Sequence, residues 1–145
     1  MMAKTFSQLA EEAMATATAI SPEDALIELS QGDDALLVDV RDESEVQVTG
    51  IGVGAINAPG RSLAWKADQE FDELYRAPEL ADRSRRILTT CGCSPCYRGA
   101  SAANLLTDMG FNNVAFVDGG MTALLEAGLK TEKFKDADVL AYLKS

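Results

Sequence analysis

The sequence predicts an α/β layer fold with a mainly parallel central sheet flanked by helices. Short apolar runs of strand length, such as residues 35–38 and 114–117, are uninterrupted, which is typical of strands buried on both faces. Segments whose apolar residues recur at helical spacing separate these runs. Strands that alternate with helices favour parallel pairing through right-handed crossovers.

The first half of the chain contains three helices and two strands by this reasoning. An N-terminal amphipathic helix is indicated by apolar residues on one face: Phe6, Leu9, Ala10 and Ala13. A second helix begins at residues 21–24, where a serine N-cap, a first-turn proline and two acids favour a helix start. Residues 35–38 predict a strand ending at Asp39, and residues 55–57 predict a weaker strand. The excursion over residues 61–76 is expected to contain a helix packed by its large apolar residues: Trp65, Phe71, Leu74 and Tyr75.

The second half repeats the alternation of strand and helix. Residues 87–90 and 114–117 predict strands, and a periodic helix that ends at Gly110 lies between them. A further helix around Met121 ends at Gly128. A C-terminal helix is indicated by Val139, Leu140 and Leu143.

Composition narrows the classes of function. The 145 residues suit one domain, and the formal net charge of −10 disfavours nucleic acid and anionic membranes as partners. Apolar runs are far shorter than the ~20 residues of a membrane span. Glu11 and Glu12 make the N-terminal segment unlike a secretory signal, so a cytoplasmic location is expected.

All three cysteines of the chain, Cys91, Cys93 and Cys96, fall within six positions, and the chain has no histidine. The absence of histidine excludes a histidine general base, a Cys–His dyad and histidine metal ligands. The cluster follows strand 87–90 and precedes a helix beginning near Arg98. In parallel sheets, ligands bind at this carboxyl edge.

A loop between a strand and a helix N-terminus can hold an anionic sulfur. Unpaired N–H groups and the helix dipole favour negative charge there. Gly92 and Gly99 would ease a tight backbone path, and the guanidinium of Arg98 suits oxyanions. The sequence therefore predicts an anion cradle in which a cysteine is activated without histidine.

Four segments, in order, resemble the rhodanese (sulfurtransferase) domain family over residues 19–130: LLVDVRDESEV with its Asp-Val-Arg and Glu45, GVGAINAPG, RGASAANLLTDMGFNNV and VDGGMTALLEAGL. The resemblance implies a rhodanese-like three-layer fold. Helical extensions would then occupy residues 1–18 and 131–145.

The resemblance also implies the chemistry. A loop cysteine would take sulfane sulfur from a small anionic donor, such as thiosulfate or a persulfide, and hold it as a persulfide. It would pass the sulfur to cyanide or a thiol, which could belong to a protein, without cofactor or metal. Asp39 and Arg41 would brace the strand end, and Gly119 and Gly120 would let the backbone approach. The substrate-binding loop would comprise Gly92, Cys93, Ser94, Pro95, Cys96, Tyr97, Arg98 and Gly99.

Two criteria disagree on the nucleophile. The family's four-residue spacing to Arg98 indicates Cys93, whereas the family's position directly after the strand indicates Cys91 and a loop lengthened by two residues. We favour Cys91, because a buried strand is harder to shift than a surface loop is to lengthen.

Other readings of the loop remain open. Cys-x-Cys-x-x-Cys could hold a metal if an acidic residue or a second subunit completed the site. Cys96 or Cys93 could instead resolve an oxidised or persulfidated Cys91, and the domain could be a non-catalytic thiol sensor. The lengthened loop would also suit an arsenate reductase or phosphatase, with Asp39 or Glu43 as the acid. The excursion's cations, Arg61, Lys66 and Arg76, are expected to gather an anionic donor.

Overall fold

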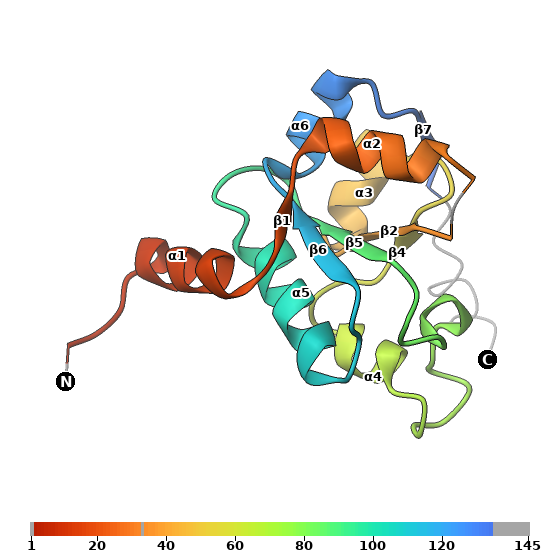
Figure 1. Ribbon diagram of the computed structural model, residues 1–145, viewed down its shortest axis with the longest axis horizontal. Coiled ribbons are helices and arrows are strands. Elements are labelled where there is room, and N and C mark those ends of the chain that lie inside the picture. The colour runs from red at the N-terminus through yellow and green to blue at the C-terminus, as the bar shows by residue number, and fades with distance from the viewer. Residues whose placement is uncertain (1, 33, 135–145) are drawn as a thin grey trace.

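A five-stranded parallel sheet forms the middle layer of the structure, a computed structural model that describes residues 2–32 and 34–134 (Figure 1). Every neighbouring pair of strands is parallel, so their carboxyl ends share one edge. This arrangement confirms the predicted α/β fold. The strand order is β1 (Ala19–Ile20), β6 (Val114–Val117), β5 (Ile87–Thr90), β2 (Leu36–Asp39) and β4 (Ile56–Asn57).

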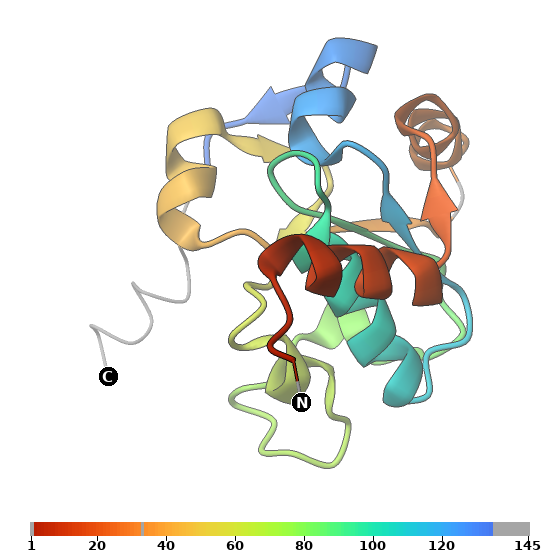
Figure 2. The same ribbon diagram turned by 90° about the vertical axis from the view of Figure 1, so that its left-hand side faces the viewer.

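Helices cover both faces of the sheet (Figures 1 and 2). On one face, α2 (Pro22–Ser30) and α6 (Gly120–Ala127) bury a cluster that includes Leu37 and Leu88. On the other face, α4 (Leu63–Ala67) and α5 (Tyr97–Asp108) bury a larger cluster. The N-terminal helix α1 (Phe6–Thr16) packs against α5 on its outer side.

The three central strands are short buried segments, of which β6 is apolar throughout whereas β2 and β5 end in polar residues. All residues of β2 and β5 are buried, and successive side chains enter opposite clusters, as with Leu37 and Val38. The predicted start of α2 is confirmed, because the Ser21 hydroxyl accepts a hydrogen bond from the N–H of Asp24 at 3.1 Å. No helix within the described ranges is long and apolar enough to cross a bilayer.

Three two-residue strands were not predicted. Besides β1, a small antiparallel sheet pairs β3 (Ile51–Gly52) with β7 (Thr131–Glu132). Segments this short carry no periodicity, so only their partners define them. Residues 131–132 thus form a strand, and the C-terminal helix expected around residues 139–143 lies outside the described residues.

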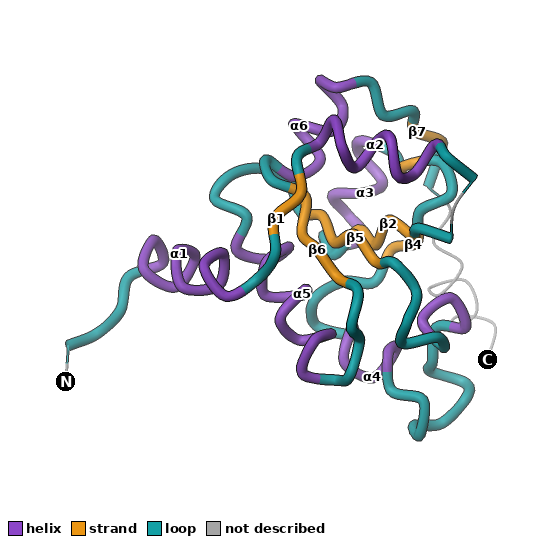
Figure 3. Tube along the Cα trace, in the orientation of Figure 1, coloured by secondary structure: helices purple, strands orange, loops and turns teal. Residues whose placement is uncertain are grey.

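The 61–76 excursion contains a helix, as predicted, but the prediction that its large apolar residues pack that helix was wrong. After the five-residue α4 (Leu63–Ala67), the chain runs mainly as loop to the short 3₁₀ turn η1 (Pro78–Leu80) and on to β5 (Figure 3). The large apolar side chains of this segment are exposed rather than buried: Trp65, Phe71, Leu74 and Tyr75. Phe71 and Tyr75 contact each other, with ring centroids 5.9 Å apart.

A candidate thiol site at the carboxyl edge of the sheet

The cysteine loop joins β5, a strand inside the sheet, to α5. It spans residues 91–96 at the carboxyl edge and reaches the start of α6 (Figure 2). The peptide bond between Ser94 and Pro95 is cis, and both residues are exposed. The structure therefore places the loop at the predicted edge, with one helix N-terminus on each side.

Cys91 is buried at the end of β5, with 3% of its surface exposed. Its sulfur faces the first turn of α5, because a Cβ built on Gly99 would lie 3.5 Å from Sγ. Burial raises the pKa of the Cys91 thiol, while the N–H of Gly99 partly opposes that rise. The neighbouring Cys96 raises the pKa further, and the positive charge of Arg98 lowers it. The thiol therefore faces the N–H of Gly99 but is mostly protonated at neutral pH.

The other two cysteines have opposite environments. Cys93 is exposed, whereas Cys96 is fully buried in the same apolar cluster as Cys91. The sulfur of Cys96 accepts the N–H of Gly119 at 3.2 Å. All three are free thiols. The loop thus has two inward thiols and one outward thiol.

Arg98 is held by a carboxylate rather than aimed freely at an anion. Its Nη1 and Nη2 donate to Glu45 of α3 (Glu43–Thr49) at 2.6 and 3.0 Å. The hydrogen bond from Arg98 lowers the pKa of Glu45, although burial opposes this shift. Sequence reasoning noted Glu45 without assigning it a partner. The position of Arg98 in the first turn of α5 offers no sequence signal that identifies its partner.

The turn Gly119–Gly120 contacts the cysteine loop directly. At Gly120, φ is +62° and an added Cβ would lie 2.7 Å from the carbonyl oxygen of Cys91. That carbonyl accepts the N–H of Met121 at 2.7 Å. Thr122 donates its N–H and its hydroxyl to the carbonyl of Gly92, each at 3.0 Å. The beginning of α6 therefore fixes the backbone of the loop, a contact in which sequence reasoning missed Thr122.

Asp39 and Arg41 form a buried ion pair behind the loop. Arg41 donates Nε and Nη2 to the Asp39 carboxylate at 3.0 and 2.8 Å, and both residues are at most 3% exposed. The amide of Asn57 donates to both of their backbone carbonyls. These contacts brace the ends of β2 and β4 at the edge that carries the loop.

The remaining loop residues anchor the first turn of α5. The carbonyl of Gly99 accepts the buried hydroxyl of Thr89 at 2.7 Å, which ties the helix to β5. The ring of Tyr97 packs edge-to-face on Phe6 of α1, with centroids 5.5 Å apart. Gly92 lies under the arginine, because an added Cβ would be 3.4 Å from Nη2 of Arg98.

The two acids considered for the loop, Asp39 and Glu43, are both paired with arginines. Within residues 2–32 and 34–134, no group of three cysteine, aspartate or glutamate side chains is arranged to hold a metal ion. The Asp39 carboxylate is enclosed by Arg41, and Glu43 pairs with Arg61 at 2.8 Å. Burial would raise the pKa of Glu43, but its contacts with Arg61 bring it below the usual value.

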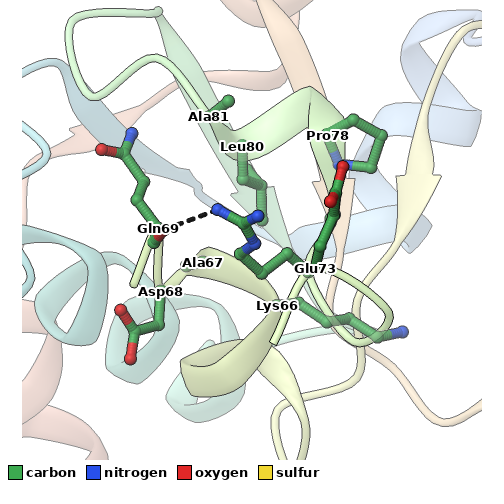
Figure 4. Close-up of a pocket in the computed structure, with 10 residues that line it drawn as sticks. Lys66, Ala67, Asp68, Gln69, Glu73, Pro78, Leu80 and Ala81 are labelled. Atoms are coloured by element: carbon green, nitrogen blue, oxygen red, sulfur yellow. Dashed lines mark hydrogen bonds between the residues drawn. The ribbon is translucent and has the colours of Figure 1, made fainter. Parts of the chain in front are cut away.

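Two cations of the excursion line a different cavity. Lys66 and Arg76 border a space of about 330 Å³, together with Asp68, Gln69 and Glu73 (Figure 4). No residue of the cysteine loop belongs to its lining. Arg76 donates to the carbonyl of Gln69 there. The expectation that these cations gather a donor at the thiols therefore has no support from their positions.

Comparison with known proteins identifies the family. A model of the rhodanese-like domain matches residues 22–127. The chain belongs to the rhodanese-like domain family. Among curated proteins, no significant sequence match was found.

Several solved structures share this fold. A Rhodopseudomonas palustris protein of unknown function, described as a possible tyrosine phosphatase, is 25% identical with a TM-score of 0.80, covering 91% of this chain and 97% of its own. The human single-domain sulfurtransferase is 26% identical with a TM-score of 0.64, and the match covers 76% of this chain and 96% of the human chain. The Wolinella succinogenes polysulfide-sulfur transferase, a homodimer, is 26% identical with a TM-score of 0.66, and the match covers 91% of this chain and 90% of the Wolinella chain.

Proposed function

We propose that this rhodanese-like domain is a sulfurtransferase in which Cys91 carries the sulfur as a persulfide. One observation carries the proposal most directly. The Cys91 sulfur lies at the end of a central strand, against the first turn of α5, where the N–H of Gly99 reaches it. An anionic persulfide in that position would be stabilised by helix N–H groups and the helix dipole.

The transfer would proceed in two displacements. The Cys91 thiolate attacks the sulfane sulfur of a donor such as thiosulfate, the donor's S–S bond breaks, and sulfite leaves with the bonding electrons. An acceptor such as cyanide or a thiol then attacks the outer sulfur of the persulfide, and the Cys91 thiolate leaves. A protein thiol could act as acceptor in the same way.

The local charges oppose the approach of a small anionic donor. The formal net charge of −10 disfavours approach of an anion, and Glu45 neutralises much of the charge on Arg98. A donor anion would therefore have to compete with Glu45 for the guanidinium. Because burial raises the pKa of Cys91, transfer is expected to be slow at neutral pH and faster in alkaline solution.

Cyanide-dependent release of thiocyanate from thiosulfate, or from polysulfide, tests the proposal. Cys91→Ser should abolish release, whereas Cys93→Ser should retain measurable transfer because its thiol lies outside the cradle. Loss of release in Cys93→Ser with retention in Cys91→Ser would move the nucleophile to Cys93. No release from either donor by the wild-type protein would favour a non-catalytic, thiol-sensing domain.

A phosphatase is the second candidate, because one structural relative is described as a possible tyrosine phosphatase. Such chemistry needs an acid to protonate the leaving group. Asp39 and Glu43, the acids first considered, are both engaged by arginines. Hydrolysis of p-nitrophenyl phosphate that depends on Cys91 would support this candidate over sulfur transfer.

A further inference from the structure

The buried thiol of Cys96 has no part in the two displacements described above. It occupies the N-cap position of α5, where a serine or aspartate side chain would normally accept a backbone N–H, yet it makes no such capping bond. Instead, its sulfur accepts the N–H of Gly119 from the turn before α6. A fully buried sulfur held by a neighbouring backbone is a positioned group rather than a surface thiol.

Cys96 also lies near Cys91. The two residues belong to one buried cluster, the same turn before α6 contacts both of them, and, besides burial, the proximity of Cys96 raises the pKa of the Cys91 thiol. Cys93, between them in sequence, points to solvent. The loop therefore brings the first and third thiols together and excludes the second.

The turn before α6 restrains both cysteines. The N–H of Met121 holds the Cys91 carbonyl at 2.7 Å, and the N–H of Gly119 holds the Cys96 sulfur at 3.2 Å. The carbonyl of Cys96 is the first acceptor of α5, bonded by the N–H of Ala100 at 2.9 Å. A sulfur added to Cys91 would consequently form beside a second thiol whose backbone is already fixed, which favours an intramolecular reaction.

We propose that Cys96 resolves the Cys91 persulfide, so that the domain releases sulfide and closes a Cys91–Cys96 disulfide when no other acceptor is present. This inference rests on the proposed function, because it requires the Cys91 persulfide. The Cys96 thiolate attacks Sγ of Cys91, the bond from Sγ to the outer sulfur breaks, and hydrosulfide leaves with the bonding electrons.

The overall change balances without an added oxidant. One thiosulfate and two thiols yield one disulfide, one sulfite and one hydrogen sulfide, since the sulfane sulfur is reduced by two electrons while the two thiols are oxidised. The reaction stops after one sulfide per chain unless a dithiol reductant reopens the disulfide by exchange. Cyanide and Cys96 would compete for the same persulfide, so sulfide should decrease as cyanide increases.

The test uses the full chain, reduced and freed of small thiols, then mixed with thiosulfate alone. The wild type should release sulfite and sulfide in equal amounts, and peptide mapping should find a disulfide joining Cys91 to Cys96. Cys96→Ser should release sulfite but no sulfide, and should accumulate the persulfide. Cys96→Ala serves as a second variant in case a serine hydroxyl in this apolar position impairs folding. Cys93→Ser should still close the disulfide.

The outcomes separate this inference from the proposed function. If Cys96→Ser forms a persulfide but the wild type releases no sulfide and forms no disulfide, the role of Cys96 is wrong and sulfur transfer stands. Sulfide release that persists in both Cys96 variants, or that stops only in Cys93→Ser, would also overturn the role. If no variant releases sulfite from thiosulfate or gains a sulfur from polysulfide, both proposals fail.

Discussion

Gly120 is the position at which a single methyl group should test how α6 supports the cysteine loop. An ideal Cβ there would lie 2.7 Å from the Cys91 carbonyl oxygen and 3.0 Å from the carbonyl carbon of Gly92. Ordinary contact begins at 3.4 Å, so the carbonyl oxygen would have to withdraw by about 0.7 Å. That displacement would weaken the 2.7 Å hydrogen bond from Met121 and move the Cys91 sulfur with its backbone.

Gly128, which ends the same helix, offers a matched control. Its φ of +110° also disfavours alanine, but nothing lies within 4 Å of an added Cβ. Gly128→Ala should therefore cost only the backbone strain, about 1 kcal/mol. Gly120→Ala should cost that strain plus the displacement, about 3 kcal/mol in total.

Denaturant unfolding and thiocyanate release, measured on both variants, check this reasoning. Gly120→Ala should lower transfer by about tenfold or more, because a displacement approaching 1 Å misaligns the reacting sulfur. Gly128→Ala should transfer sulfur at a rate close to that of the wild type. Equal unfolding free energies and equal rates for the two variants would refute the claim that the loop depends on this close approach.

Three further predictions concern the pair behind the loop, the anchoring of α5 and the thiol itself. Asp39→Asn should lower the free energy of unfolding by about 3–5 kcal/mol, because it leaves the buried guanidinium of Arg41 uncompensated. Glu43→Gln breaks a partly exposed ion pair and should lower the free energy of unfolding by less than about 1 kcal/mol. Equal losses for the two variants in urea unfolding would contradict this prediction. Thr89→Val should cost about 1 kcal/mol by removing the buried hydroxyl that bonds the Gly99 carbonyl, and an unchanged denaturation midpoint would argue against that bond. Because the pKa of Cys91 is raised, its thiolate fraction should still be increasing above pH 8.5, the usual cysteine pKa. The rate of iodoacetamide labelling of Cys91, followed by peptide mass spectrometry, should therefore increase with pH through that range. A labelling rate that reaches a plateau near neutral pH would contradict the argument that burial raises the pKa.

The sequence identified the central strands well because each is buried on both faces. Residues 87–90 and 114–117 were predicted with the bounds of β5 and β6. Residues 114–117 form an uninterrupted apolar run, whereas β5 begins with two apolar residues and ends with two buried threonines. The two-residue strand β1 has no such run and exists through its pairing with β6. The large residues of the 61–76 segment misled the prediction, because apolar character alone does not reveal which side chains a surface loop leaves exposed.

The position of the site was predictable, but its internal arrangement was not. A cysteine directly after a parallel strand lies at the carboxyl edge of the sheet for any conformation of the following loop, so the position of Cys91 could be predicted. Spacing along a loop carries no information on which thiols turn inward, so the burial of Cys96 and the exposure of Cys93 required the structure. The same holds for Arg98, whose carboxylate partner lies 53 positions away in sequence.

The most direct test of the account is the location of the sulfur after reaction with thiosulfate. Cys96→Ser protein, in which the persulfide should accumulate, would be trapped with an alkylating reagent and cleaved by trypsin to give the peptide of residues 87–98. Fragmentation between Cys91 and Cys93 then assigns the added sulfur atom. The account predicts that the added sulfur is on Cys91. Its presence on Cys93, with Cys91 alkylated as a plain thiol, would contradict the account.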